Sequence, residues 1–187
     1  MKIRKIHIMG ASGVGTSTLG QELSKVLPHV HLDSDDYFWE HKYTKQSEIS
    51  ARLARLTRDL THKEPWILSG AVCGWGDELR PLFDMVIFLW LPQEIRLDRL
   101  RVREYERYGD DILPGRSKYE AYQTFMEWAA LYDTAGVEVR SKVLHEEWMS
   151  ALECPIVRIE GDLTVRERVE VVLNYIKSSE SGGNHDD

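Results

Sequence analysis

Gly10-Ala-Ser-Gly-Val-Gly-Thr-Ser-Thr18 is the stretch of sequence that decides the fold. It follows the apolar run Ile6-His-Ile-Met9, which is typical of a short buried strand, and it leads into residues 16–27, a helical pattern that Pro28 ends. Glycines let the chain turn sharply and approach a ligand closely, and the helix N-terminus adds a positive dipole. The stretch therefore predicts a strand–turn–helix unit that holds a polyphosphate.

This stretch fits the phosphate-loop template, G-x4-G-K-[ST] between a strand and a helix, except at one position. Thr16 stands where the template has lysine, and Ser17 falls where a hydroxyl ligates Mg²⁺. Another cation must then meet the charge of the β- and γ-phosphates. An ordinary glycine–serine turn, or a loop that binds nucleotide without catalysis, remains as an alternative. We predict that ATP and Mg²⁺ bind here, in contact with Gly10, Ala11, Ser12, Gly13, Val14, Gly15, Thr16, Ser17 and Thr18.

Short apolar runs alternate with helical patterns along the rest of the chain. The further strands are expected at residues 30–32, 66–68, 85–91 and 156–159. The helices are expected at residues 46–61, 92–108, 117–132, 137–151 and 164–177. This alternation predicts an α/β fold in which helices cover both faces of a parallel sheet. We expect one domain over residues 1–177 and a disordered tail, rich in Ser, Gly and Asp, over residues 178–187.

Composition and charge exclude several classes of protein. The chain has 187 residues and a net charge of −7, which argues against general binding to a nucleic acid polymer. The apolar run Met85–Leu91 is too short to span a membrane, and we see no targeting segment. Cys73 and Cys154 have neither metal-ligand nor redox spacing. We therefore expect a cytoplasmic protein with reduced thiols, a monomer or alternatively a homodimer.

An acidic cluster, Asp33-Ser-Asp-Asp36, follows the second strand and runs into the aromatic triplet Tyr37-Phe-Trp39. A carboxylate beside a phosphate loop can orient or deprotonate an acceptor hydroxyl, and it can hold Mg²⁺ through water. We predict that Asp35 is catalytic and that Asp33 and Asp35 join Ser17 at the metal. The alternative is a solvated acidic turn next to aromatic side chains of the core.

Four arginines recur on one face of the helix expected after the fourth strand. They are Arg96, Arg99, Arg103 and Arg107. The planar guanidinium group binds phosphate through two parallel hydrogen bonds, so Arg99 and Arg103 are the predicted replacements for the missing lysine. A surface helix with many salt bridges is the alternative, because acidic residues interleave with the arginines.

The loop resembles those of P-loop kinases related to adenylate, cytidylate and shikimate kinases, and the order of elements is similar over roughly residues 4–177. Archaeal-type cytidylate kinases are similar in carrying Gly-Ser-Gly-Thr-Thr-Thr, also without the lysine. The acidic cluster resembles the Asp-Ser-Asp of shikimate kinases and the Asp-Asp-Phe-aromatic of uridine and nicotinamide riboside kinases. Together with Gly74-Trp-Gly76, these features resemble a group of bacterial proteins labelled adenylate kinase or related kinase.

The resemblance implies a three-layer α/β/α sandwich with a five-stranded parallel sheet in the order 2-3-1-4-5. It also implies a nucleoside monophosphate kinase-like architecture with a short lid at about residues 109–117. Arg99 and Arg103 stand where the arginine pair precedes the lid in adenylate kinases. Ser69 stands where adenylate kinases have an aspartate, which shifts the expected metal role to Asp33 and Asp35. The residues expected at the acceptor are Asp35, Asp36, Trp39, Trp75 and Arg116.

The implied reaction is Mg²⁺-dependent transfer of the ATP γ-phosphoryl group to a nucleotide, a nucleoside or another small acceptor. A phosphorylated acceptor needs cations, which Arg52, Arg55 and Arg58 can supply, whereas an alcohol needs a carboxylate such as Asp35. The sequence leaves these acceptors open. It also leaves open a nucleotide-binding regulatory protein with a lysine-less loop and no transfer activity.

Overall fold

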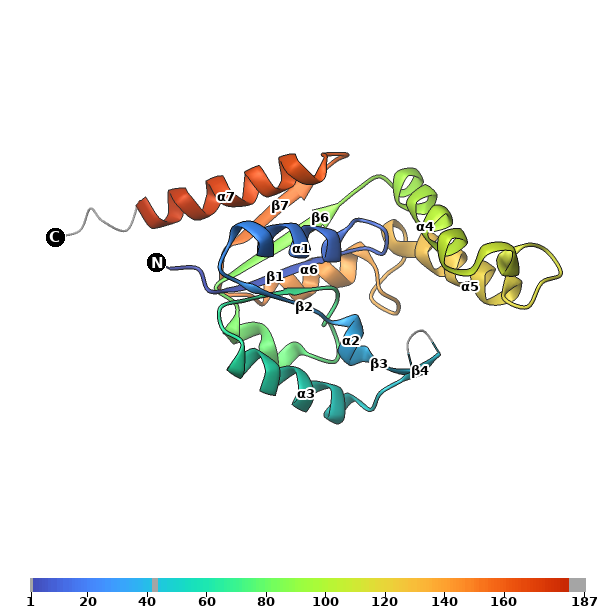
Figure 1. Cartoon of the computed structure of the whole chain (residues 1–187), viewed down its shortest axis with the longest axis horizontal. Helices are drawn as coiled ribbons and strands as arrows, with labels where there is room; N and C mark the ends of the chain where they lie inside the picture. Colours follow the sequence, from blue (N-terminus) through green and yellow to red (C-terminus); the bar gives the residue numbers. More distant parts are fainter. Residues whose placement is uncertain (1, 42–43, 182–187) are drawn as a thin grey trace.

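The computed structural model describes residues 2–41 and 44–181 (Figure 1). Its central sheet has five parallel strands in the order β2-β5-β1-β6-β7. These strands are β1 Lys5–Gly10, β2 Val30–Asp33, β5 Trp66–Ser69, β6 Met85–Trp90 and β7 Ile156–Glu160. Counted along the chain, the order is 2-3-1-4-5, so the predicted fold class and strand order are confirmed.

Helices cover both faces of this sheet and create two apolar cores. On one face, α1 (Thr16–Val26) and α7 (Val165–Ser181) contribute Leu19, Leu23, Val172 and Ile176. On the other face, α3 (Ile49–His62) and α6 (Lys142–Ser150) contribute Leu56, Leu60, Trp148 and Met149. Neighbouring strand residues alternate between the two cores, which explains why β6 is continuously apolar.

Two groups of elements lie beyond the carboxyl ends of the strands (Figure 1). One is the helix pair α4 (Gln93–Tyr108) and α5 (Tyr119–Ala130), which residues 109–118 connect through the short 3₁₀ helix η2 (Gly109–Ile112). The other is α2 (Asp35–Phe38) followed by the small antiparallel pair β3 (Trp39–His41) and β4 (Lys45–Gln46). Two further 3₁₀ helices, η1 (Asp77–Leu82) and η3 (Leu131–Asp133), complete the connections.

Several predicted boundaries differ from the structure. The helix expected from residue 137 begins at Lys142, because the Ser141 side chain caps it by accepting a hydrogen bond from the Leu144 N–H. The tail expected to be disordered from Ser178 is helical as far as Ser181, so that prediction is wrong for residues 178–181. There the hydroxyls of Ser178, Ser179 and Ser181 donate to carbonyls of the preceding turn, which keeps them within the helix. Residues 182–187 lie outside the described residues.

Each helix was predicted to belong to a globular domain and not to a membrane span. None of the helices in residues 2–41 and 44–181 is both long enough and apolar enough to cross a bilayer.

Candidate active site

A cavity of about 1040 Å³ opens at the carboxyl ends of the strands. Its lining comes from the loop after β1, from α2 and β3, from the segment after β5, from α4 and α5, and from Arg140 before α6. The features that the sequence places after its first three strands therefore meet in one cavity. This is the edge at which ligands bind in open α/β sheets.

Most of the predicted phosphate loop faces this cavity. The lining residues are Ala11, Ser12, Gly13, Gly15, Thr16, Ser17 and Thr18. Gly10 and Val14 are not among them. The Val14 side chain is buried in the core, and a Cβ at Gly10 would lie 2.4 Å from the Leu89 carbonyl oxygen of β6. These two residues support the loop from behind.

Gly15 shapes the point at which α1 begins. Its φ of +93° lies in the left-handed region, where residues with a Cβ are strained. Helix α1 starts at the next residue, and within the described part of the chain no side chain caps its first N–H groups. Those N–H groups and the positive end of the helix dipole are therefore suited to bind an anion.

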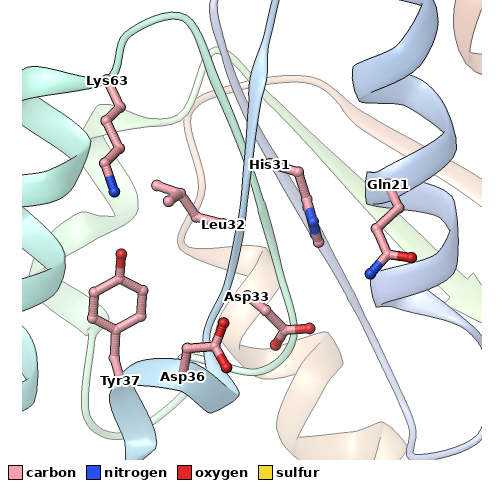
Figure 2. A pocket seen from close by; sticks show the side chains of 7 residues that line it. All are labelled: Gln21, His31, Leu32, Asp33, Asp36, Tyr37 and Lys63. Carbon is pink, nitrogen blue, oxygen red and sulfur yellow. The ribbon is translucent and has the colours of Figure 1, made fainter.

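Two of the three aspartates line the cavity. Asp33 and Asp35 both do so, and the Asp35 N–H donates to Asp33 Oδ1 over 3.0 Å, which fixes the turn between them. Asp36 instead lines a separate pocket of about 330 Å³, with the neighbours shown in Figure 2. Consecutive residues of a helical turn point in different directions. Asp36 therefore lies away from the phosphate loop, although the sequence predicted it at the acceptor.

The arginines of α4 divide between structure and site. Arg96 is fully buried, donates to the Leu91 carbonyl and pairs with Asp133, so it holds the helix in place. Arg99 and Arg103 line the cavity, as does Arg107. Arg99 Nη2 lies 2.8 Å from Asp162 Oδ1, and Arg103 Nη2 lies 2.9 Å from Glu104 Oε1. A guanidinium has five N–H donors, so one such ion pair leaves donors for phosphate.

Arg140 is the candidate that the sequence reasoning missed. Its Nη2 donates to the carbonyl oxygen of Gly10 over 2.6 Å, and the residue lines the cavity. Its Nε is buried, and no acceptor among the described residues lies within hydrogen-bond distance of it. Burial lowers the pKa of Arg140, an effect that Cys73 and Asp35 oppose. Arg140 thus brings a fixed cation to the first residue of the phosphate loop.

The other residues predicted at the acceptor have different positions. Trp39 and Trp75 line the cavity, as expected. Arg116 does not: it is exposed in the connection between α4 and α5, where its N–H donates to the Leu113 carbonyl. Lys118, which the sequence reasoning did not single out, lines the cavity from the same connection.

Ser69 offers no carboxylate where adenylate kinases have one. The side chain is fully buried, and its Oγ lies 2.8 Å from His31 Nε2. Burial lowers the pKa of His31, although Asp33 and Asp36 oppose the shift, so this imidazole is neutral at pH 7. Ser69 is therefore part of the support behind Asp33, and the carboxylates of the site come from β2 and α2.

Comparison with known proteins shows the family of the chain. A family model described as an AAA domain matches residues 6–123. The chain belongs to this family. It is 61% identical over 176 residues to the uncharacterized protein YqaC of Bacillus subtilis (strain 168), across 94% of this chain and 99% of that protein.

Two kinases are more distant relatives. The cytidylate kinase of Pyrobaculum neutrophilum is 21% identical over 184 residues, 91% of each chain. A solved structure of shikimate kinase from Bacteroides thetaiotaomicron superposes with a TM-score of 0.59 at 18% identity, across 94% of this chain and 99% of that one. The predicted resemblance to the P-loop kinase group is confirmed by the family match together with these two kinases.

The donors at the loop fit a magnesium ion that arrives with a nucleotide. Ser17, Asp33 and Asp35 supply oxygen atoms at the cavity. In residues 2–41 and 44–181, no group of three or more His, Cys, Asp or Glu side chains is arranged to hold a metal by itself. Mg²⁺ in nucleotide sites takes one or two protein oxygens and completes its shell with water and phosphate, so the donor set suits it.

Proposed function

We propose that this protein transfers the γ-phosphoryl group of ATP to a small-molecule acceptor in a Mg²⁺-dependent reaction. The observation that supports it is the meeting of a phosphate loop, two carboxylates and several arginines in one cavity. At about 1040 Å³ the cavity is at the upper end of the range of about 300–1000 Å³ that one small ligand occupies. Two ligands side by side, a donor and an acceptor, explain such a size.

The residues of the cavity then have distinct roles. The loop N–H groups bind the polyphosphate, and Ser17 and Asp33 hold the metal, which neutralises phosphate charge when it is bound. Asp35 orients the acceptor hydroxyl and accepts its proton as the new O–P bond forms. The bond between the γ-phosphorus and the bridging oxygen breaks, and ADP leaves.

The missing lysine requires cations from elsewhere in the chain. Arg140 is fixed at Gly10 by a hydrogen bond and needs no rearrangement to face the phosphates. Arg99 and Arg103 approach from α4 and supply charge to the transferring group. We assign the main role to Arg140, because a preorganised charge stabilises a transition state without a cost of reorientation.

The test combines ATP binding with product detection. The protein is mixed with ATP, Mg²⁺ and a panel of alcohols and phosphorylated acceptors, and ADP and phosphorylated product are measured by mass spectrometry. Transfer to an acceptor supports the proposal. Calorimetric binding of ATP without transfer to any acceptor supports instead a regulatory protein that binds nucleotide.

A further inference from the structure

The acceptor end of the cavity contains an aromatic surface. Phe38, Trp39 and Trp75 all line the cavity, and we call these three residues the aromatic wall. The Phe38 and Trp39 ring centroids lie 4.9 Å apart, and those of Phe38 and Trp75 lie 6.5 Å apart. Phe38 belongs to the same short helix as Asp35, so the wall lies next to the carboxylate assigned to the acceptor hydroxyl.

A buried arginine lies behind this wall. Arg52 is only 4% exposed, and its guanidinium carbon is 4.2 Å from the Phe38 ring centroid and 5.4 Å from that of Trp75. Its Nε donates to the Ser47 carbonyl over 3.1 Å. The charge of Arg52 thus supports the rings from within the protein, and Arg52 is not among the residues that line the cavity.

The two other arginines of α3 are also directed elsewhere. Arg55 Nη2 donates to the Asp36 carbonyl, and its guanidinium lies over the Tyr37 ring. Arg58 pairs with its neighbour Asp59. Neither lines the cavity. The expectation that α3 supplies cations to a phosphorylated acceptor is therefore not supported.

The elements that carry the wall bring no cation to the cavity. Among the described residues that line it from 33–46 and 70–75, the only charged ones are Asp33 and Asp35. Burial raises the pKa of the Cys73 thiol to about 12, so this lining residue is neutral. The cations of the lining come from α4, from the connection after it and from the segment before α6, and they are Arg99, Arg103, Arg107, Lys118 and Arg140. A phosphate or carboxylate on an acceptor at the wall would therefore meet carboxylates and aromatic rings.

We infer that the acceptor is an alcohol that carries a flat aromatic ring and no anionic group, as a nucleoside or another heterocyclic alcohol does. The ring stacks on the aromatic wall, and the hydroxyl is held by Asp35. Aromatic side chains bind flat rings through their faces with little dependence on ring identity. This inference rests on the proposed function, because it assigns the acceptor of that reaction.

The experiment uses acceptors that separate the ring from the anion. Uridine, cytidine, adenosine and thymidine are each compared with the corresponding 5′-monophosphate, whose anion replaces the 5′-hydroxyl, and with the 3′-monophosphate, which carries the anion and keeps the 5′-hydroxyl. Each is also compared with its free sugar, ribose or 2-deoxyribose, which lacks the base. Shikimate serves as an anionic alcohol without an aromatic ring. Transfer from ATP is measured by mass spectrometry, and ATP affinity is measured by calorimetry.

We expect at least one nucleoside to be phosphorylated in preference to its monophosphates and to its free sugar. Trp39→Leu should raise its KM by about 5- to 100-fold, the range for loss of one base-stacking side chain. Trp39→Phe keeps a ring, so its KM for the nucleoside should be close to that of the parent protein. In both variants the Kd for ATP should stay within about twofold of the parent value. Tyr105→Leu is the matched control, because Tyr105 is an exposed aromatic residue of α4 that does not line the cavity.

Two other results would each overturn the inference in a different way. The ring-bearing neutral acceptor would be rejected if transfer to a monophosphate, to shikimate or to a free sugar is preferred. An unchanged KM for the nucleoside in Trp39→Leu would reject it as well. Both results would leave the proposed kinase function in place. Binding of ATP with no transfer to any member of the panel would reject the kinase function, and this inference with it.

Discussion

Nη2 of Arg140 lies 2.6 Å from the carbonyl oxygen of Gly10, although the two residues are 130 positions apart in the chain. The contact ties the segment before α6 to the first residue of the phosphate loop. Arg168 makes a similar contact from the other side, because its Nη1 donates to the Val14 carbonyl over 2.6 Å. Two cations, the half-buried Arg140 and the buried Arg168, therefore hold the loop whose own lysine is absent.

The left-handed conformation of Gly15 leads to a prediction about nucleotide binding. Gly15→Val places a branched side chain at φ +93° in a residue that lines the cavity, and this strains the turn whose N–H groups bind the phosphates, so ATP affinity should fall by about 100-fold or more. Calorimetry with ATP and Mg²⁺ measures this. Gly161→Val is the matched control, because Gly161 has a similar φ of +92° outside the cavity and its replacement should lower stability but not ATP affinity. Undiminished ATP affinity in Gly15→Val contradicts the assignment of the loop.

The oxygens of Ser17 and Asp33 lead to a prediction about magnesium. Ser17→Ala and Asp33→Asn should each raise the Mg²⁺ concentration for half-maximal transfer by about tenfold. The measurement is the transfer rate across a Mg²⁺ titration at fixed ATP. Ser24→Ala replaces a half-buried serine of the same helix that does not line the cavity, and it should behave as the parent protein. If the Mg²⁺ dependence of both site variants equals that of the parent, the metal assignment is wrong.

The sheet could be predicted from sequence because its signals are local. The continuous apolar run at residues 85–90 and the glycine pattern after β1 each specify an element without reference to the rest of the chain. Helix α2 and the β3–β4 pair were missed, since segments of two to four residues are too short to show a period.

The site was harder to predict because its residues meet through long-range contacts. The spacing of α3 shows which residues share a face, but it does not show that Arg52 would lie behind Phe38. Arg140 has no motif around it, and only the fold brings it to Gly10. The lid at residues 109–117 stays a prediction, because its closure depends on a bound nucleotide.

Burial of His7 leads to a prediction about stability and pH. The imidazole is fully buried, stacks on Phe83 and hydrogen-bonds the Leu68 carbonyl, and burial lowers its pKa to about 4 from 6.5. Between pH 6.5 and pH 4 the unfolded chain binds this proton and the folded chain does not, so stability falls as pH falls. From pH 7 to pH 5 the contribution of His7 to the free energy of unfolding should fall by about 2 kcal/mol.

Denaturant unfolding of the parent and of His7→Phe at both pH values checks this. Between pH 7 and pH 5 the free energy of unfolding should fall by about 2 kcal/mol less in the variant than in the parent. His29 and His31 also have lowered pKa values, and they remain in both proteins. His145 remains as well, but a charge on His7 contributes to lowering its pKa, so the difference reports His7 together with its effect on His145. Equal losses in parent and variant would show that His7 does not titrate in this way.

The last prediction concerns the cation that replaces the loop lysine. Negative charge spreads over the transferring phosphoryl group, and Thr16 offers no charge to meet it. Arg140→Met should lower the rate of transfer by about 100-fold or more, the loss expected on removal of one preorganised charge. Arg99→Ala or Arg103→Ala should lower it less, because both of these side chains are 42% exposed and water screens their charge. Arg101→Ala is the control on α4, since Arg101 is exposed, pairs with Asp98 and does not line the cavity.

A second substitution separates charge from loop support in this prediction. Thr16→Lys returns the lysine to its usual place, so adding it to Arg140→Met should recover part of the rate if the lost function is charge at the phosphates. If the function of Arg140 is only to hold Gly10, the added lysine recovers nothing, and ATP affinity and thermal stability fall together instead. A different result would assign the replacement charge to α4. In that case Arg140→Met would transfer at a near-normal rate, and the double variant Arg99→Ala with Arg103→Ala would transfer weakly. The guanidinium groups of Arg99 and Arg103 would then be the ones that meet the phosphates.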